Sequence, residues 1–295
     1  MIWLILLGYV ALATYIARSM PANDFERDYL GLDTALMQAD YQHDFGLPMP
    51  ARKPWRLPGE YYVYAWAKHQ THALWQGRAA AIAVSSLGLW LTMQYAQALG
   101  GRGIVAGLIV LTSPYLVSQL TAASYKAPIA TLWVGGLYAL HTGHPLVAMA
   151  CGATLALLRA TSWGMALWLL WASGGIVLAS GLAAYLWLQH REVVLSQGWT
   201  RLLRGQSCPV QGIPRDGWGY ALRTLARRYE GWGVWLVGAL VVGRWHHSFD
   251  TVLMTSVGVF VLTHLPRALI RPKWVIGYMA EWMLPVAVEI GVMLK

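Results

Sequence analysis

The chain has 295 residues, of which 57% are hydrophobic and 12% are charged. Soluble domains carry about 25% charged residues, so this composition argues against a soluble globular protein. Two cysteines are too few for a disulfide-rich scaffold. The net charge of +9 is interpreted first as membrane topology and not as nucleic-acid binding.

Apolar segments follow one another along most of the chain. A membrane-spanning helix needs about 20 mostly apolar residues, and somewhat fewer when it is buried among other helices. We therefore predict an all-α, polytopic transmembrane bundle of about nine spans. The candidate spans are residues 2–17, 79–99, 103–122, 128–140, 145–158, 163–188, 232–242, 249–264 and 274–294. The first has no Lys or Arg at its amino end, which favours a retained anchor over a cleaved signal peptide.

Basic residues gather on one side of this arrangement. With the amino terminus inside, the inner connections hold eleven Lys and Arg residues, and the short outer ones hold only Lys126, Arg159 and Arg244. This excess predicts an amino terminus inside the cell. We expect the membrane to be an inner (cytoplasmic) membrane of bacterial type. Binding to anionic lipid explains the basic inner segment without nucleic acid. The predicted units are a first transmembrane helix (1–17), an outer loop (18–77), a bundle (78–189), a basic inner loop (190–231) and C-terminal helices (232–295).

The outer loop is the unusual part, because it holds seven of the thirteen acidic residues. Asn23 followed by Glu26 resembles a capping box, and an apolar stripe at helical spacing predicts an amphipathic juxtamembrane helix over residues 23–39. A proline-rich stretch then breaks the helix. A second interfacial helix is predicted over residues 60–76, with apolar Val63, Ala67 and Leu74 on one face and Lys68 and His72 on the other.

The order of these features resembles the GT-C superfamily of membrane glycosyltransferases, in particular the protein O-mannosyltransferase and aminoarabinose transferase group. The similar positions, over about residues 20–175, are Asp28, His43-Asp44-Phe45-Gly46-Leu47-Pro48, Lys53-Pro54, the aromatic run from Tyr61 to Trp66, Arg78 and Thr112-Ser113-Pro114. The resemblance implies transfer of a sugar from a polyprenyl-phosphate donor at the outer membrane face.

Such a transfer needs a carboxylate to deprotonate the acceptor and cations to stabilise the departing phosphate. We expect Asp28 to be the general base, with Asp24 and Asp44 as substitutes for it. The expected phosphate ligands are Arg52, Lys53, Arg56, Arg78 and Arg159. No cofactor is required, although the chemistry would accommodate a divalent metal ion.

The sequence also departs from the resemblance. Tyr29 follows Asp28 where an acidic residue is common, Arg52 replaces a Glu, and residues 125–131 lack the second carboxylate of the family. An alternative function is therefore a non-catalytic membrane subunit or scaffold that binds lipid or protein partners in a larger complex. A third is a small transporter, suggested by Glu281 and Glu289 inside the last predicted span.

Each candidate residue has a structural alternative. Asp28 could be a solvated acid on an amphipathic helix, and the basic residues of the outer loop could contact lipid headgroups or pair with nearby carboxylates. Arg78 and Arg159 could reach the membrane interface. Glu281 and Glu289 could pair with Lys126, Arg159 or Arg244. His43, His69 and His72 could be polar surface residues or could touch a metal ion.

Overall fold

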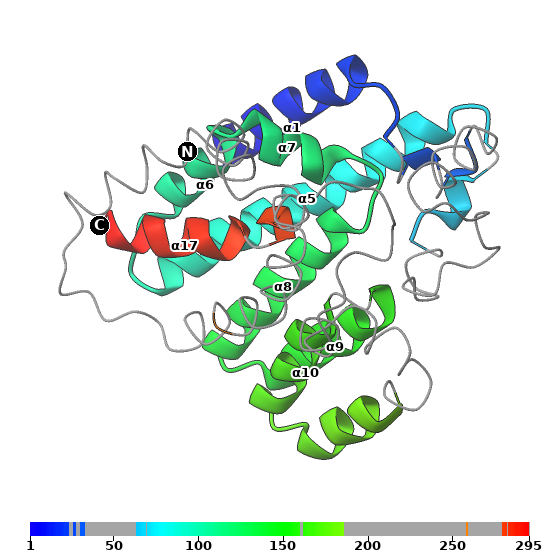
Figure 1. The fold of residues 1–295 in the computed structure, drawn as a ribbon. Coiled ribbons are helices and arrows are strands. Elements are labelled where there is room, and N and C mark those ends of the chain that lie inside the picture. The colour runs from blue at the N-terminus through cyan, green and yellow to red at the C-terminus, as the bar shows by residue number, and fades with distance from the viewer. Residues whose placement is uncertain are drawn as a thin grey trace, which may run out of the picture.

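A computed structural model describes part of the chain. The described residues are 1–23, 26–27, 30–32, 63–68, 70–159, 162–185, 258, 279–281 and 283–294. Within these ranges the regular elements are helices, so the all-α prediction is confirmed for this part of the chain (Figure 1).

Two described helices are long and apolar enough to cross a membrane, namely α1 (Ile2–Ser19) and α5 (Ala73–Ala98). In α1 the buried residues recur every four positions, at Ile5, Tyr9, Ala13 and Ala17, so one stripe packs inward and the remaining faces carry exposed apolar side chains. That pattern suits a helix at the edge of a bundle in lipid. Helix α5 begins before the predicted span, which places Arg78 in its second turn and not at its opening.

The predicted span over residues 103–122 is not one straight helix. It consists of α6 (Gly103–Leu111) and α7 (Pro114–Thr121), which are bent by 85° relative to each other. Pro114 cannot donate a backbone hydrogen bond and occupies the first turn of α7, where no donor is needed. The Ser113 side chain caps the new helix by accepting a hydrogen bond from the Leu116 N–H at 3.2 Å. If this bent pair crosses as one unit, the described residues contain three candidate spans.

Shorter helices complete the described bundle. They are α8 (Lys126–His141), α9 (Pro145–Leu158), α10 (Trp163–Ala172), Ile176–Tyr185 and α17 (Met283–Met293), the last preceded by the 3-10 turn η3 (Met279–Glu281). The predicted bounds of 145–158 are confirmed. The predicted span 163–188 is interrupted at Gly174, whose φ of 84° belongs to the left-handed region. The predicted spans 232–242 and 249–264 lie outside the described residues, apart from residue 258.

Helix α5 runs through the middle of the bundle and packs against α1, α6, α8 and α17 (Figure 1). Small residues allow this close approach. A Cβ on Gly88 would lie 2.6 Å from Thr131 Oγ1, and one on Gly101 would lie 2.6 Å from Val292 Cα. Thr131 also donates a hydrogen bond to the Val84 carbonyl at 3.0 Å. Small contact residues and hydroxyl groups that bond across helices are typical of helix packing in membranes.

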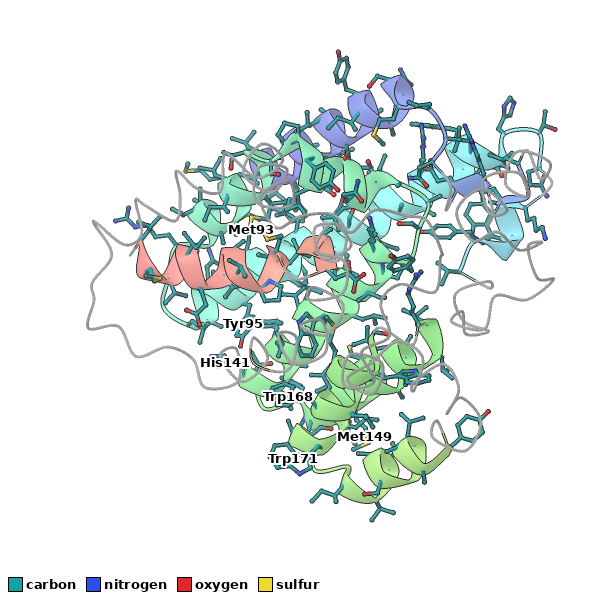
Figure 2. All side chains as sticks on the ribbon, viewed as in Figure 1. Met93, Tyr95, His141, Met149, Trp168 and Trp171 are labelled. Atoms are coloured by element: carbon teal, nitrogen blue, oxygen red, sulfur yellow. The ribbon has the colours of Figure 1, made fainter. Side chains whose placement is uncertain are left out.

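Aromatic contacts join the far end of α5 to α8, and α8 in turn to α10 (Figure 2). The Tyr95 ring lies 5.5 Å from that of His141 and 5.9 Å from that of Tyr138, measured between centroids. Trp133 meets Trp168 edge-on at 5.8 Å. Such pairs add to the apolar burial that holds α8 between α5 and α10.

The outer loop differs from its two predicted helices where it is described. Glu26, Arg27 and Leu30 are helical, but Gly31 has a φ of 70°, and the Leu32 N–H bonds back to the Arg27 carbonyl at 2.7 Å. This geometry closes a helix, so the predicted continuous helix to residue 39 is wrong.

The prediction of one helix over residues 60–76 is also wrong. The chain makes a short 3-10 turn, η1 (Ala65–Ala67), and α5 starts only at Ala73. The predicted division into buried and exposed residues is nevertheless confirmed. Ala67 is buried, Val63 and Leu74 pack against the core, and Lys68 and His72 are exposed.

Candidate functional site

Most of the predicted site lies outside the described residues. This holds for the predicted catalytic acids Asp24, Asp28 and Asp44, for the predicted phosphate ligands Arg52, Lys53 and Arg56, and for His43 and His69. The two remaining predicted ligands, Arg78 and Arg159, are described, and both are buried.

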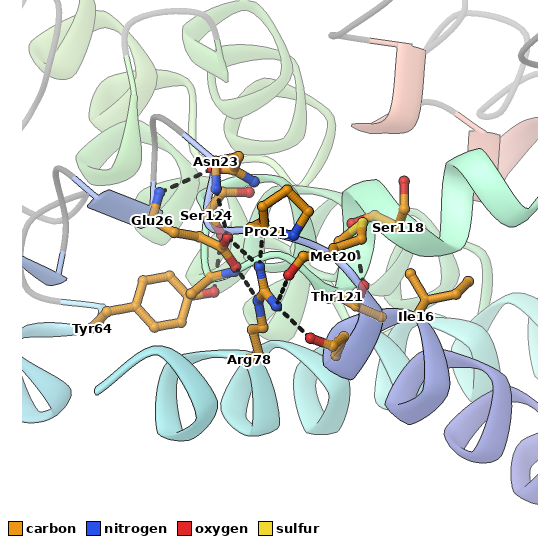
Figure 3. A network of polar contacts seen from close by, with 12 residues as sticks. Ile16, Met20, Pro21, Asn23, Glu26, Tyr64, Arg78, Ser118, Thr121 and Ser124 are labelled. Carbon is orange, nitrogen blue, oxygen red and sulfur yellow. Dashed lines mark hydrogen bonds and ion pairs between the residues drawn. The ribbon is translucent and has the colours of Figure 1, made fainter. Parts of the chain in front are cut away.

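Arg78 is 2% exposed and binds acceptors from the protein itself (Figure 3). Its Nε and Nη2 atoms donate to the two carboxylate oxygens of Glu26, at 2.7 and 2.8 Å. Nη1 donates to the Met20 carbonyl at 2.8 Å and to the Ala17 carbonyl, and Nη2 donates to the Pro21 carbonyl at 2.9 Å. A guanidinium has five N–H donors, and these contacts use five. In this conformation Arg78 ties the end of α1 and the start of the outer loop to α5.

Glu26 is completely buried, whereas its position in the sequence predicts only a capping role. The capping box is confirmed, because the Glu26 N–H donates to Asn23 Oδ1 and the Asn23 N–H donates to Glu26 Oε2, both at 3.0 Å. In addition, Oε1 accepts from the Ala123 N–H at 2.9 Å. Each carboxylate oxygen thus accepts two hydrogen bonds, counting those from Arg78. The burial of Leu30, four residues later, marks the same inward face.

The buried segment 122–126, which ends with the first residue of α8, connects the outer loop to the bundle. Ala123 binds Glu26, and the Ser124 carbonyl accepts a hydrogen bond from the Tyr64 hydroxyl at 2.9 Å (Figure 3). Burial, together with the negative charge of Glu26, raises the pKa of Tyr64 above its ordinary value. This segment therefore fixes two outer-loop residues against the core.

The next residue of segment 122–126, Tyr125, meets a second buried arginine, and Lys126 follows it. Arg159 follows the last residue of α9, is 5% exposed, and places its Cζ atom 3.8 Å from the centroid of the Tyr125 ring. A guanidinium on an aromatic face is a favourable cation–π contact. Lys126 is 6% exposed, and its Nζ donates to Gln119 Oε1 on α7. Two cations thus lie buried at the amino end of α8, one beside the Tyr125 ring and one adjacent to Tyr125 in the chain.

Buried charges of both signs are equal in number among the described residues. The acids are Glu26, Glu281 and Glu289, and the bases are Arg78, Lys126 and Arg159. Burial of a charge is expensive unless an opposite charge compensates it, so this equality is what a bundle of low dielectric requires. Glu281 lies in η3, which packs against α7 and α8, and Glu289 lies on α17.

No group of three His, Cys, Asp or Glu side chains close enough to hold a metal ion occurs among the described residues. Comparison with protein-family models, with curated proteins and with solved structures found no match to this chain. Two or three of the described helices are long and apolar enough to cross a membrane, which suits a membrane protein.

Proposed function

We propose that this protein is an integral-membrane glycosyltransferase of GT-C type, which transfers a sugar from a polyprenyl-phosphate donor. It acts at the outer face of a bacterial inner membrane, with its amino terminus inside and about nine spans. The observation that carries this proposal is the burial of Lys126 and Arg159 together among apolar helices. Ionisable residues at membrane depth are costly and generally mark a functional site.

The two cations have the chemistry that a phosphate group needs. Arg159 stacks the face of its guanidinium on Tyr125, whereas hydrogen bonds to phosphate oxygens use the guanidinium edge. Lys126 opens α8, where the aligned peptide dipoles add positive potential. The surrounding apolar helices offer an environment in which an isoprenoid chain is soluble.

This assignment changes the role of Arg78, whose donors bind the protein's own acceptors. Arg78 positions the outer loop over the bundle, and Lys126 joins Arg159 as a phosphate ligand. Asp28 is retained as the proposed general base, with Asp24 and Asp44 as substitutes. Arg52, Lys53 and Arg56 are retained as further ligands of the donor, and no metal ion is required.

The Glu26–Arg78 network favours a second candidate function, a non-catalytic membrane subunit that keeps this scaffold within a larger complex. The network is a structural contact, and residues 125–131 contain no carboxylate. In that case the buried cations would bind lipid without catalysis, and loss of Asp28 would leave glycan transfer unchanged.

Transfer from a labelled polyprenyl-phosphate sugar, in membranes that lack the wild-type gene, tests the proposal. The rate of sugar transfer by the Arg159→Gln variant is expected to fall about 100-fold, because one donor that stabilises developing charge is removed. Arg18→Gln is the matched control, because Arg18 also lies over an aromatic ring, that of Trp75 at 5.5 Å, but is exposed at the end of α1. Asp28→Asn is expected to abolish transfer. Full transfer by both Arg159→Gln and Asp28→Asn would overturn the proposal.

A further inference from the structure

Tyr64 is an outer-loop residue whose side chain reaches the start of α8. It is 2% exposed, and its hydroxyl donates to the Ser124 carbonyl at 2.9 Å (Figure 3). That carbonyl and the Tyr125 N–H belong to one planar peptide group. The Tyr64 hydroxyl therefore holds the peptide group that leads into Tyr125.

The peptide group that follows Tyr125 is held as well. The Tyr125 carbonyl accepts a hydrogen bond from the Ile129 N–H at 3.0 Å, in the first turn of α8. The Lys126 N–H, in the same peptide group, donates to Ser124 Oγ at 3.4 Å. A residue has only two soft backbone dihedrals, and fixing the peptide groups on both sides fixes them. The direction of the Tyr125 side chain is set in this way.

A second outer-loop residue holds the chain slightly earlier. Glu26 Oε1 accepts from the Ala123 N–H at 2.9 Å, and the same carboxylate binds Arg78. Glu26 thus holds the peptide group before Ala123, and Tyr64 holds the one after Ser124. The outer loop fixes both ends of this two-residue stretch.

The ring that this backbone directs is the one that contacts Arg159. Tyr125 is 3% exposed, and Arg159 Cζ lies 3.8 Å from its ring centroid. A movement of the ring would therefore move the guanidinium beside it. Because hydrogen bonds from a planar guanidinium to phosphate oxygens depend on its direction, such a movement would weaken phosphate binding.

We infer that Tyr64 is a positioning residue of the proposed phosphate site. Its hydrogen bond to Ser124 sets the direction of the Tyr125 ring, and the ring sets the position of the Arg159 guanidinium. The inference rests on the proposed function, because it takes Arg159 to be a phosphate ligand. The outer loop thereby contributes to lipid binding through the backbone of segment 122–126.

The test measures the affinities of two lipids for the full chain in lipid nanodiscs. The probes are a polyprenyl monophosphate and the uncharged polyprenol of equal chain length, and the measured quantity is the ratio of their affinities. Tyr64→Phe removes only the hydroxyl and is expected to lower the preference for the phosphate about fivefold, within the range of coupling between residues of one network. An unchanged ratio in Tyr64→Phe would overturn the inference.

Tyr9→Phe is the matched control, because it also removes a hydroxyl from a buried tyrosine. Tyr9 lies on α1 and is completely buried, but its hydroxyl interacts with Ser85 on α5 and not with segment 122–126. This variant is expected to keep the wild-type ratio. An equal fall of the ratio in Tyr9→Phe and Tyr64→Phe would contradict a specific role of Tyr64.

A double-mutant cycle on the same ratio separates positioning from a general loss of structure. In the Arg159→Gln background, Tyr64→Phe is expected to change the ratio little, because the guanidinium that it positions is absent. An equal fold loss in both backgrounds would mean that Tyr64 acts independently of Arg159 and would contradict the inference.

Failure of the inference and failure of the proposed function are distinguishable. Loss of the phosphate preference in Arg159→Gln, with an unchanged ratio in Tyr64→Phe, refutes the inference and leaves the proposed function standing. Equal affinity of the wild type for the two lipids refutes the proposed function. A cycle of Tyr64→Phe and Arg159→Gln on unfolding then tests the coupling without a ligand, because the two substitutions should destabilise the protein non-additively and strict additivity contradicts the coupling.

Discussion

Substitution of Glu26 by Gln probes the network that fixes the outer loop to the bundle. The two side chains have nearly the same volume, so no cavity is created. The carboxylate accepts two hydrogen bonds from Arg78 and one each from the Ala123 and Asn23 N–H groups. A glutamine amide has one oxygen, so its NH₂ group would face two of these donors, and the Arg78 charge would lose its partner. Removing one member of a buried ion pair costs about 3–5 kcal/mol of folding free energy.

Denaturation of the purified protein in mixed micelles by sodium dodecyl sulfate, followed by tryptophan fluorescence, measures this cost. Arg27→Gln is the matched control, because Arg27 is the next residue of the same helical turn and is only partly buried. A cycle with Arg78→Met should give a coupling energy of about 0.5–3 kcal/mol between the two positions. A cost for Glu26→Gln no larger than that for Arg27→Gln would refute the assignment of this pair as the loop anchor.

Three further predictions follow from the packing and from the topology. Gly88→Ala should destabilise the protein by about 1–3 kcal/mol, because its Cβ would overlap Thr131 Oγ1, whereas Gly8→Ala, which meets nothing within 4 Å, should be neutral in the same denaturation assay. Tyr64→Phe should cost about 1 kcal/mol at neutral pH. Because burial raises the pKa of Tyr64, the wild type should lose this advantage as the pH rises above the ordinary tyrosine value of 10.0, and a pH-independent difference between the two proteins would contradict the assignment. In a variant without native cysteines, Gln70→Cys should react with an impermeant maleimide in intact cells and Arg102→Cys only after permeabilisation, and the reverse labelling would invert the proposed topology.

Helical periodicity and turn chemistry predicted much of the described fold. The all-α class, the first helix and the bounds of 145–158 follow from apolar run length and from the Pro and Gly residues that flank such runs. The predicted spans 103–122 and 163–188 gave no position for the breaks near Pro114 and Gly174, because hydropathy averaged over a window does not register a break. Local signals of this kind fix where a helix ends more reliably than hydropathy does.

The buried network could be predicted only in part. The capping box of Asn23 and Glu26 was visible in the sequence, but the pairing of Glu26 with Arg78 joins residues 52 positions apart and depends on how α1 and α5 pack. The same holds for Arg159 and Tyr125, which meet only because α9 packs against α8. Hydropathy showed that such charges lie near apolar segments, but tertiary packing decides which of them meet.

Photo-crosslinking of a polyprenyl phosphate with its reactive group next to the phosphorus tests the central claim most directly. Peptide mapping of the labelled wild-type protein is expected to find adducts in the segments that contain Tyr125, Lys126 and Arg159, with loss of those adducts in Arg159→Gln and their retention in Arg18→Gln. Adducts confined to the exposed face of α1, around Trp3 and Tyr15, would show that the lipid contacts only the outside of the bundle and would contradict a buried phosphate site.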